Sequence, residues 1–379
     1  METHMPLTLL GGLSADQFMR RYWQKKPLLI RGAIPDMVPP IAKPALFELA
    51  SQEGVESRLI QHGAKGWTLR HGPFARRALP AATQPAWTLL VQGVDLHHEG
   101  AHALLKQFRF VPDARLDDLM ISYASDQGGV GPHFDSYDVF LLQATGCRRW
   151  SIGRQRDMAL QQGVPLKILE RFEPEQTFDL EPGDMLYLPP RYAHDGVAVG
   201  GDCMTYSIGL RSPARNHLGA DLLARIAEAH ADELEHAVIS ARTHYRDPGQ
   251  AAVATPAAMP AALQAFAQEA VEAALREPHA VERALGESMT EPKSNVWFES
   301  SDVPDEWLKV TLDRRTRMLY DERHIYINGE SFRASGRDAK LMRSLADTRE
   351  LQARELASAS DDAIELLSDW CEAGWLRAG

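Results

Sequence analysis

A histidine and an aspartate stand two residues apart in "GPHFDSYDVF", residues 131–140, between a glycine-rich turn and an apolar run. Side chains alternate along an extended strand, so His133 and Asp135 point to the same face and can bind one ion. A third ligand is offered by His194, which ends "PGDMLYLPPRYAH" after a turn and an apolar strand. Two histidines and one carboxylate make the facial triad of non-haem Fe(II) sites, which leaves adjacent coordination positions open.

The spacing of these residues favours a barrel. Asp135 and His194 are 59 residues apart, about the length that several antiparallel strands need to bring two strand ends together. The alternative is that His133 and Asp135 only cap a turn and that His194 is a surface histidine.

An arginine supplies a second signal. Iron sites of this type use 2-oxoglutarate as a cosubstrate, and its distal carboxylate needs a cation at the far end of the pocket. Arg148 lies 15 residues past His133 in "QATGCRRW", and a guanidinium can bind a carboxylate through two parallel hydrogen bonds. Arg149 should face the other side of the strand. The alternative for Arg148 is an exposed charge at a strand end.

Three segments must position these residues. Residues 1 to about 210 contain short β-type runs such as "WTLLVQGV", "DVFLLQATG", "DMLYLPP" and "TYSIGLRS", which predict a β-sandwich or barrel. Residues 214 to about 290 are alanine-rich, with apolar residues at helical spacing that runs through Tyr245. The last segment mixes helix and strand, with an Asn-Gly turn in "HIYINGESFRA", in the order of a small winged-helix-like domain.

Two further residues near the triad are candidates for binding the substrate. Tyr137 shares the inward strand face with Asp135, although core packing is an equal alternative. Asp126 lies in the glycine-rich loop "SDQGGVG" and could pair with a cationic substrate; its alternative is a role in the turn.

At this point the sequence resembles a known family. "GPHFDSYDVFLLQATGCRRW" and "PGDMLYLPPRYAHDG" resemble the JmjC family of cupin-fold, Fe(II)- and 2-oxoglutarate-dependent oxygenases, and "FMRRYWQKKPLLIRGA" and "MTYSIGLRSP" resemble its ribosomal oxygenase branch. The resemblance implies a mostly β catalytic domain with a double-stranded β-helix over residues 1–212, a helical dimerisation domain over 213–293 and a winged-helix-like domain over 294–379. It also implies that His133, Asp135 and His194 bind iron, and that Arg148, Ser122 and Thr205 contact 2-oxoglutarate.

The expected activity is protein hydroxylation with O2 as the oxidant, on an arginine of large-ribosomal-subunit protein sixteen. Three alternatives stay open: a histidinyl hydroxylase, a JmjC-type demethylase, and a metal-binding cupin without oxygenase activity.

Charge and composition narrow the choice of partners. The net charge of -11 suits a basic ribosomal protein and opposes binding to bare nucleic acid. Residues 301–379 carry 12 Lys and Arg against 16 Asp and Glu, so we expect no direct DNA binding by the last domain. The three cysteines form no CxxC pair, and no apolar run is long enough for a membrane helix, so we expect a cytoplasmic protein. The alanine-rich helices, together with the family resemblance, predict a homodimer.

Overall fold

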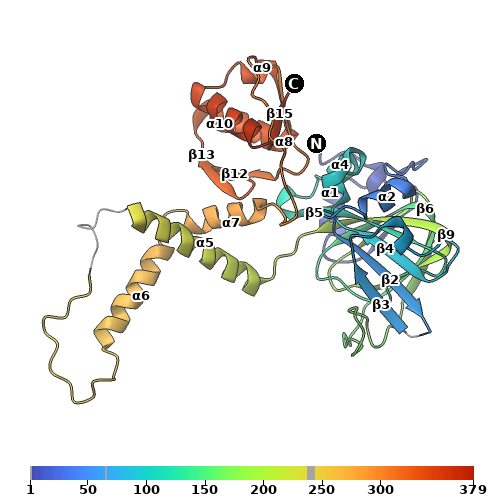
Figure 1. Cartoon of the computed structure of the whole chain (residues 1–379), viewed down its shortest axis with the longest axis horizontal. Coiled ribbons are helices and arrows are strands. Elements are labelled where there is room, and N and C mark those ends of the chain that lie inside the picture. Colours follow the sequence, from blue (N-terminus) through green and yellow to red (C-terminus); the bar gives the residue numbers. More distant parts are fainter. Residues whose placement is uncertain (1, 65, 237–243) are drawn as a thin grey trace. The chain divides into compact units, whose positions relative to one another are not determined.

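The computed structural model describes residues 2–64, 66–236 and 244–379 (Figure 1). It divides into an N-terminal unit, residues 1–212 with 295–297, and a C-terminal unit, residues 213–294 with 298–379. The three domain boundaries expected from the sequence remain predictions. Among the described residues, no helix is both long and apolar enough to cross a membrane.

The N-terminal unit is mostly β-structure with short helices. Its helices are α1 (Ala15–Arg21), α2 (Lys43–Leu49), α3 (Val94–His97) and α4 (Glu99–Lys106). Its strands are β1 (Leu28–Ile30), β2 (Ser57–Gly63), β3 (Gly66–His71), β4 (Trp87–Val91), β5 (Leu116–Ala124), β6 (Val139–Gly153), β7 (Gln176–Leu180), β8 (Met185–Leu188) and β9 (Ala193–Leu210). The strands pair antiparallel in the order β1-β8-β6-β9-β5-β4-β2-β3, with β7 also paired to β6.

The two longest strands of the sheet, β6 and β9, pair with each other. The apolar run in "DVFLLQATG" and the arginines of "QATGCRRW" lie on the same strand, β6. The register between β6 and β9 shifts between Gln143 and Cys147, where Gly146 has a φ of 65°. This irregular corner bends the strand, so its first half pairs with β8 and its second half with β7.

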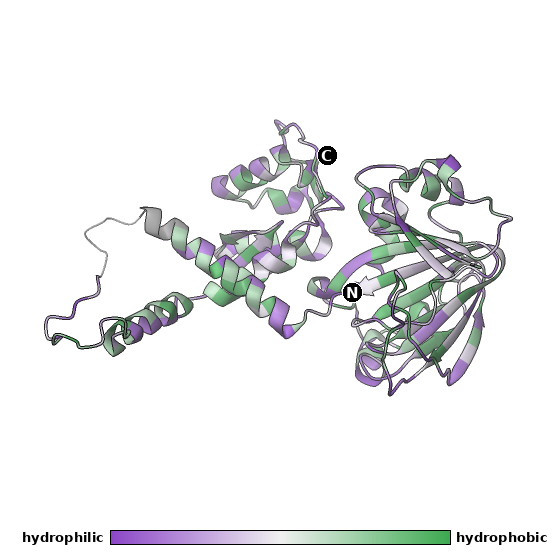
Figure 2. Ribbon diagram, turned by 60° about the horizontal axis from the view of Figure 1, so that its bottom comes forward, coloured by the Kyte–Doolittle hydropathy of each residue, from purple (hydrophilic) through white to green (hydrophobic). Residues whose placement is uncertain are grey.

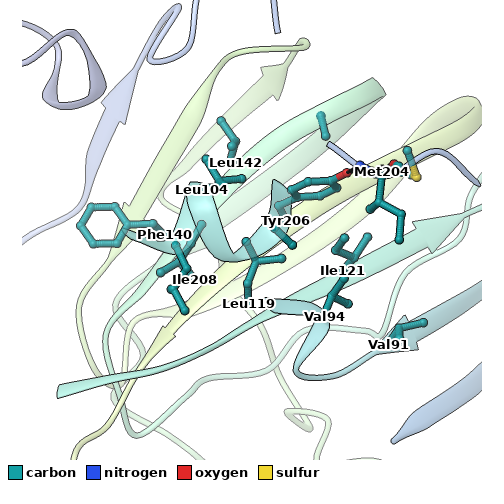
Figure 3. Close-up of a cluster of buried hydrophobic side chains, with 14 of the residues drawn as sticks. Val91, Val94, Leu104, Leu119, Ile121, Phe140, Leu142, Met204, Tyr206 and Ile208 are labelled. Atoms are coloured by element: carbon teal, nitrogen blue, oxygen red, sulfur yellow. Dashed lines mark hydrogen bonds between the residues drawn. The ribbon is translucent and has the colours of Figure 1, made fainter. Parts of the chain in front are cut away.

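Both faces of β6 are buried. Phe140 and Leu142 point into the main core, which also contains side chains of β4, β5, β9 and α4 (Figure 3). Val139 and Leu141 belong instead to a smaller cluster on the opposite face, with Trp150. A strand buried on both faces has a continuous apolar sequence, which explains "VFLL".

The C-terminal unit contains α5 (Arg215–His236), α6 (Ala261–Leu275), α7 (Ala280–Thr290), α8 (Gly336–Thr348), α9 (Ala353–Leu356) and α10 (Asp361–Glu372). Its strands are β10 (Lys309–Leu312), β11 (Met318–Tyr320), β12 (His324–Ile327), β13 (Glu330–Arg333), β14 (Glu350–Gln352) and β15 (Leu376–Ala378). The Asn-Gly turn forms the predicted hairpin between β12 and β13, with φ of 46° at Asn328 and 92° at Gly329. The helix predicted to run through Tyr245 is described to His236, and residues 237–243 lie outside the described residues.

Candidate metal centre

The two histidines of the predicted triad face each other across an isolated antiparallel bridge. The His133 N–H donates to the His194 carbonyl over 2.9 Å, and the His194 N–H donates to the His133 carbonyl over 2.8 Å. This pairing brings the imidazole centroids within 4.2 Å. These backbone hydrogen bonds therefore join residues that are 61 positions apart in the sequence.

The backbone also sets which ring nitrogens are free. His133 Nδ1 lies 2.8 Å from the Gly131 carbonyl, and His194 Nδ1 lies 2.9 Å from the Tyr192 carbonyl. A carbonyl only accepts, so each Nδ1 carries the proton and each Nε2 keeps its lone pair for a metal. The pKa of His194 is lowered to about 4, mainly because the ring is buried and secondly because His133 lies beside it. The ring therefore stays neutral.

Asp135 completes the cluster. Its Oδ2 lies 3.6 Å from His194 Nε2, and the ligand atoms of the three residues all lie within 4.8 Å of one another. The Arg191 N–H donates to the Asp135 carbonyl over 2.7 Å, which ties the HxD segment to the turn before His194. One ion can therefore be shared by His133, Asp135 and His194 as the sequence predicts.

The triad opens into a cavity of about 300 Å³. Arg148 lines this cavity and is only 3 % exposed, and its Nε and Nη2 have no hydrogen-bond partner in the described chain. Burial raises the pKa of the neighbouring Asp195 carboxyl, and the charges of His133 and Arg148 oppose that shift. Arg149 faces the other way, with a two-pronged exposed pair to Asp179 at 2.7 and 2.8 Å. The strand-face prediction for the two arginines thus agrees with the geometry.

Ser122 and Thr205 also line the cavity and lie opposite each other on β5 and β9. The Thr205 hydroxyl donates to Gln143 Oε1 over 2.9 Å, so its proton is used inside the protein. The Ser122 hydroxyl makes only a long 3.4 Å bond to the Thr205 carbonyl. Ser122 is therefore the better hydrogen-bond donor to a bound carboxylate.

The two residues expected to bind the substrate differ in outcome. Tyr137 lines the cavity, and 38 % of the residue is exposed. Partial burial and, secondly, the nearby Asp135 carboxylate raise the pKa of its phenol. Asp126 is not part of the cavity wall; its Oδ1 accepts a 2.9 Å hydrogen bond from the Gly200 N–H. This hydrogen bond favours the alternative given for Asp126, a role in the turn, over pairing with a substrate in this cavity.

Besides the triad residue Asp135, the acidic residues that line the cavity are Asp117 and Asp118. The β5–β9 register shifts between Leu116 and Asp118, which accounts for adjacent residues reaching one cavity. Asp118 is 2 % exposed and accepts a 2.8 Å hydrogen bond from Gln92. The two adjacent aspartates in "LDDLM" were the available sequence signal. The bulge that turns both of them towards the cavity could not be predicted from the sequence.

The fold and this cluster define a JmjC-type, cupin-like domain with a His-Asp-His metal centre. Residues 103–218 match the family model for the JmjC domain, and residues 272–377 match the model for the ROXA-like winged helix. The chain thus belongs to the JmjC-domain ribosomal oxygenase family.

Individual relatives support this assignment. The chain is 41 % identical over 209 residues to the ribosomal protein uL16 3-hydroxylase of Escherichia coli, and 37 % identical over 211 residues to a probable ribosomal oxygenase of Haemophilus influenzae. These matches cover 54 % of this chain in both cases, and 55 % and 52 % of the two relatives, so the chain spans about half the length of the curated relatives it matches.

Similarity in structure extends further along the chain. A crystal structure of E. coli ycfD has a TM-score of 0.81 at 29 % identity, covering 97 % of this chain and 98 % of that one. Another structure, of the E. coli ribosomal oxygenase YcfD in complex with cobalt and 2-oxoglutarate, has a TM-score of 0.78 at 29 % identity, covering 96 % and 97 %.

Proposed function

We propose that this chain is an Fe(II)- and 2-oxoglutarate-dependent protein hydroxylase that adds one oxygen to the β-carbon of an arginine in ribosomal protein uL16. The observation that carries the proposal is the buried guanidinium of Arg148, whose Nε and Nη2 have no hydrogen-bond partner in the described chain, in the same cavity as the triad. Such a charge is costly to bury without a counter-ion, and the distal carboxylate of 2-oxoglutarate would provide one. The E. coli relative solved with cobalt and 2-oxoglutarate supports this ligand.

The residues present fit the metal and the cosubstrate. The Nε2 atoms of His133 and His194 and the Asp135 carboxylate would hold the ion, and Arg148 with Ser122 would orient the cosubstrate. Bound Fe(II) would supply O2 activation, coupled to conversion of 2-oxoglutarate to succinate and CO2, so that one oxygen atom enters the substrate C–H bond. The apolar wall of Val139, Leu141 and Trp150 limits the access of water.

The wall of the cavity suits a cationic substrate. Asp117 and Asp118 supply carboxylates, and the Tyr137 ring supplies an aromatic face, which together match an arginine side chain. The net charge of -11 favours the approach of a basic ribosomal protein. The name of the E. coli relative supports uL16 as that protein, and a ribosomal substrate would place the reaction in the cytoplasm.

The test uses purified protein with Fe(II), 2-oxoglutarate and uL16 peptides, and fragmentation mass spectrometry locates the added oxygen. We expect a hydroxylated arginine and an equal amount of succinate, both lost in His133→Ala together with bound iron. Oxidation of a histidine would instead indicate a histidinyl hydroxylase, and release of formaldehyde a demethylase. Failure of the iron-loaded protein to bind 2-oxoglutarate would leave a metal-binding cupin.

We also propose that α5 and α6 form a homodimer interface. The part of α6 that the structure describes buries no residue, and Val271 and Leu275 are 63 % and 40 % exposed. Leu223 on α5 is 55 % exposed, and the hydropathy colouring shows apolar residues along both helices (Figure 2). A second copy of the chain would cover these residues, because a 15-residue helix such as α6 that buries none of its side chains is only marginally stable alone.

A further inference from the structure

A second, smaller cavity of about 110 Å³ lies within the C-terminal unit, at the N-terminal end of α7. It is lined by Pro278, His279, Arg283, His324, Ser331 and Arg333. Four of the six side chains are arginines or histidines, and no carboxylate belongs to this wall. The metal centre plays no part in it, because the triad and its cavity belong to the N-terminal unit.

The histidines stand out because His324 has a buried ring nitrogen without a hydrogen bond. His324 is 5 % exposed, and its Nδ1 has no hydrogen-bond partner in the described chain, although Asp321 Oδ1 lies 3.5 Å away. His279, whose ring is 5.9 Å from that of His324, precedes α7 with a φ of 67° and makes no side-chain cap. A buried imidazole that lines a cavity with an unpaired nitrogen indicates a missing partner.

The charges around this cavity favour an anion. Arg333, the cross-strand neighbour of His324, is exposed and has no ion pair within the described ranges. Arg283 has only a distant partner, with Nη2 3.8 Å from Glu277 Oε1. Glu287 is already bound by the Ser331 hydroxyl over 2.6 Å. The N-terminus of the 11-residue α7 adds its partial positive charge.

We propose that this cavity binds a single phosphate group, either inorganic phosphate or the terminal phosphate of a small phosphomonoester. Two arginine forks and a helix N-terminus are the groups that recognise tetrahedral oxyanions, and the volume accepts one such group. A long polyanion fits poorly, because residues 301–379 carry 12 Lys and Arg against 16 Asp and Glu.

The experiment is a calorimetric titration of the full-length protein with inorganic phosphate, in a buffer free of other oxyanions. We expect the double variant Arg283→Gln/Arg333→Gln to weaken binding by about tenfold or more, since it removes two charge-assisted contacts. The matched control Arg323→Gln/Arg337→Gln removes the same charge from exposed positions in the same unit and should bind like wild type. Proton and nitrogen resonances of the His324 imidazole should shift on addition of phosphate.

Equal affinities for both double variants, or an unchanged His324 resonance, would overturn the proposal. So would loss of binding in Arg148→Met, because the anion would then occupy the cavity of the metal centre. If the double variant does not fold, Arg333→Gln alone replaces it, since that side chain is exposed. A second titration with adenosine monophosphate separates the two sources: tighter binding than phosphate indicates a phosphomonoester, and equal binding indicates free phosphate.

Discussion

Each histidine of the metal centre uses one ring nitrogen for the fold and leaves the other for chemistry. The Nδ1 protons are held by the Gly131 and Tyr192 carbonyls, so neither ring needs a metal to choose its tautomer. These contacts come from residues two positions away in the sequence. The short segments around each ligand therefore contain the information that orients it.

We expect the buried charge of Arg148 to destabilise the ligand-free protein and to bind the carboxylate of 2-oxoglutarate. Arg148→Met should raise the thermal unfolding midpoint of the ligand-free protein, because it removes a buried unpaired charge. The same change should weaken 2-oxoglutarate binding by on the order of 1.5–3 kcal/mol or more. Differential scanning calorimetry and isothermal titration measure the two effects.

Arg149→Met is the matched control. Its pair with Asp179 is exposed to solvent and should contribute little to stability, and 2-oxoglutarate binding should not change. If both variants lowered cosubstrate affinity equally, the assignment of Arg148 to the inward face would be wrong.

Residue types and spacing were enough to propose the triad and Arg148. The expected strand does not extend to the first two ligands, because His133 forms only an isolated bridge and β6 begins at Val139. The role of Asp126 could not be decided from the sequence, since its hydrogen-bond partner Gly200 is 74 residues away. Asp117 and Asp118 were missed because a register shift determines their position. Long-range loop contacts and bulges leave no periodic signal in a single sequence.

At the scale of elements, the site depends on how closely β6 and β9 approach. Gly196, two residues after His194, pairs with Trp150, and a Cβ there would lie 2.5 Å from the indole ring. Gly196→Ala should cost about 1–3 kcal/mol of unfolding free energy, because the ring must move. Metal affinity should fall with it, since the same strand positions His194.

Chemical denaturation and metal titration check this prediction. Gly201→Ala on the same strand is the control, because nothing lies within 4 Å of a Cβ at that position. Equal stability of the two variants would show that the contact with Trp150 can relax.

The stability of the hairpin formed by β12 and β13 should depend on pH through Asp321. Burial alone would raise the pKa of Asp321, but hydrogen bonds from the Tyr326 hydroxyl and from the Arg323 and His324 N–H groups lower it to about 2. The folded carboxyl thus holds its proton less tightly than the unfolded one, whose pKa is 3.8. Its stabilising effect is complete above about pH 4 and is lost as the pH falls towards 2.

Thermal unfolding of wild type and Asp321→Asn across this range tests the point. The gap between the two midpoints should be on the order of 2–4 °C near pH 6, because the side chain is partly exposed and its contribution is discounted to about 1 kcal/mol. The gap should close towards pH 2. A gap that did not depend on pH would assign the effect to packing instead.

At the scale of the whole molecule, we expect the N-terminal unit to bind the metal and the C-terminal unit to form the dimer. A chain ending after Ser212 should keep its metal affinity, because every triad residue and the cavity wall lie before that point. It should sediment as a monomer, since α5 and α6 carry the proposed interface. Sedimentation velocity of the truncated and full-length proteins measures this, and a dimer of the truncated form would move the interface to the β-domain.

The sequence predicted this division through its change from β-type runs to alanine-rich helices. It also predicted the winged-helix-like end, since the Asn-Gly turn and the amphipathic helices are local signals. What it could not provide was the pairing of strands that are distant in sequence, such as β1 with β8, because pairing depends on the whole sheet.

The mutual hydrogen bonds of His133 and His194 affect how the protein can gain and lose its ion. In a small zinc finger the ion organises the chain, and a chelator unfolds it. Here the two segments that carry the histidine ligands are joined by their own backbone hydrogen bonds. The site should therefore keep its folded structure when the ion dissociates. Loading should therefore be rapid and reversible, and one folded preparation should accept different divalent ions in turn, with occupancy set by the supply of each metal in the surroundings.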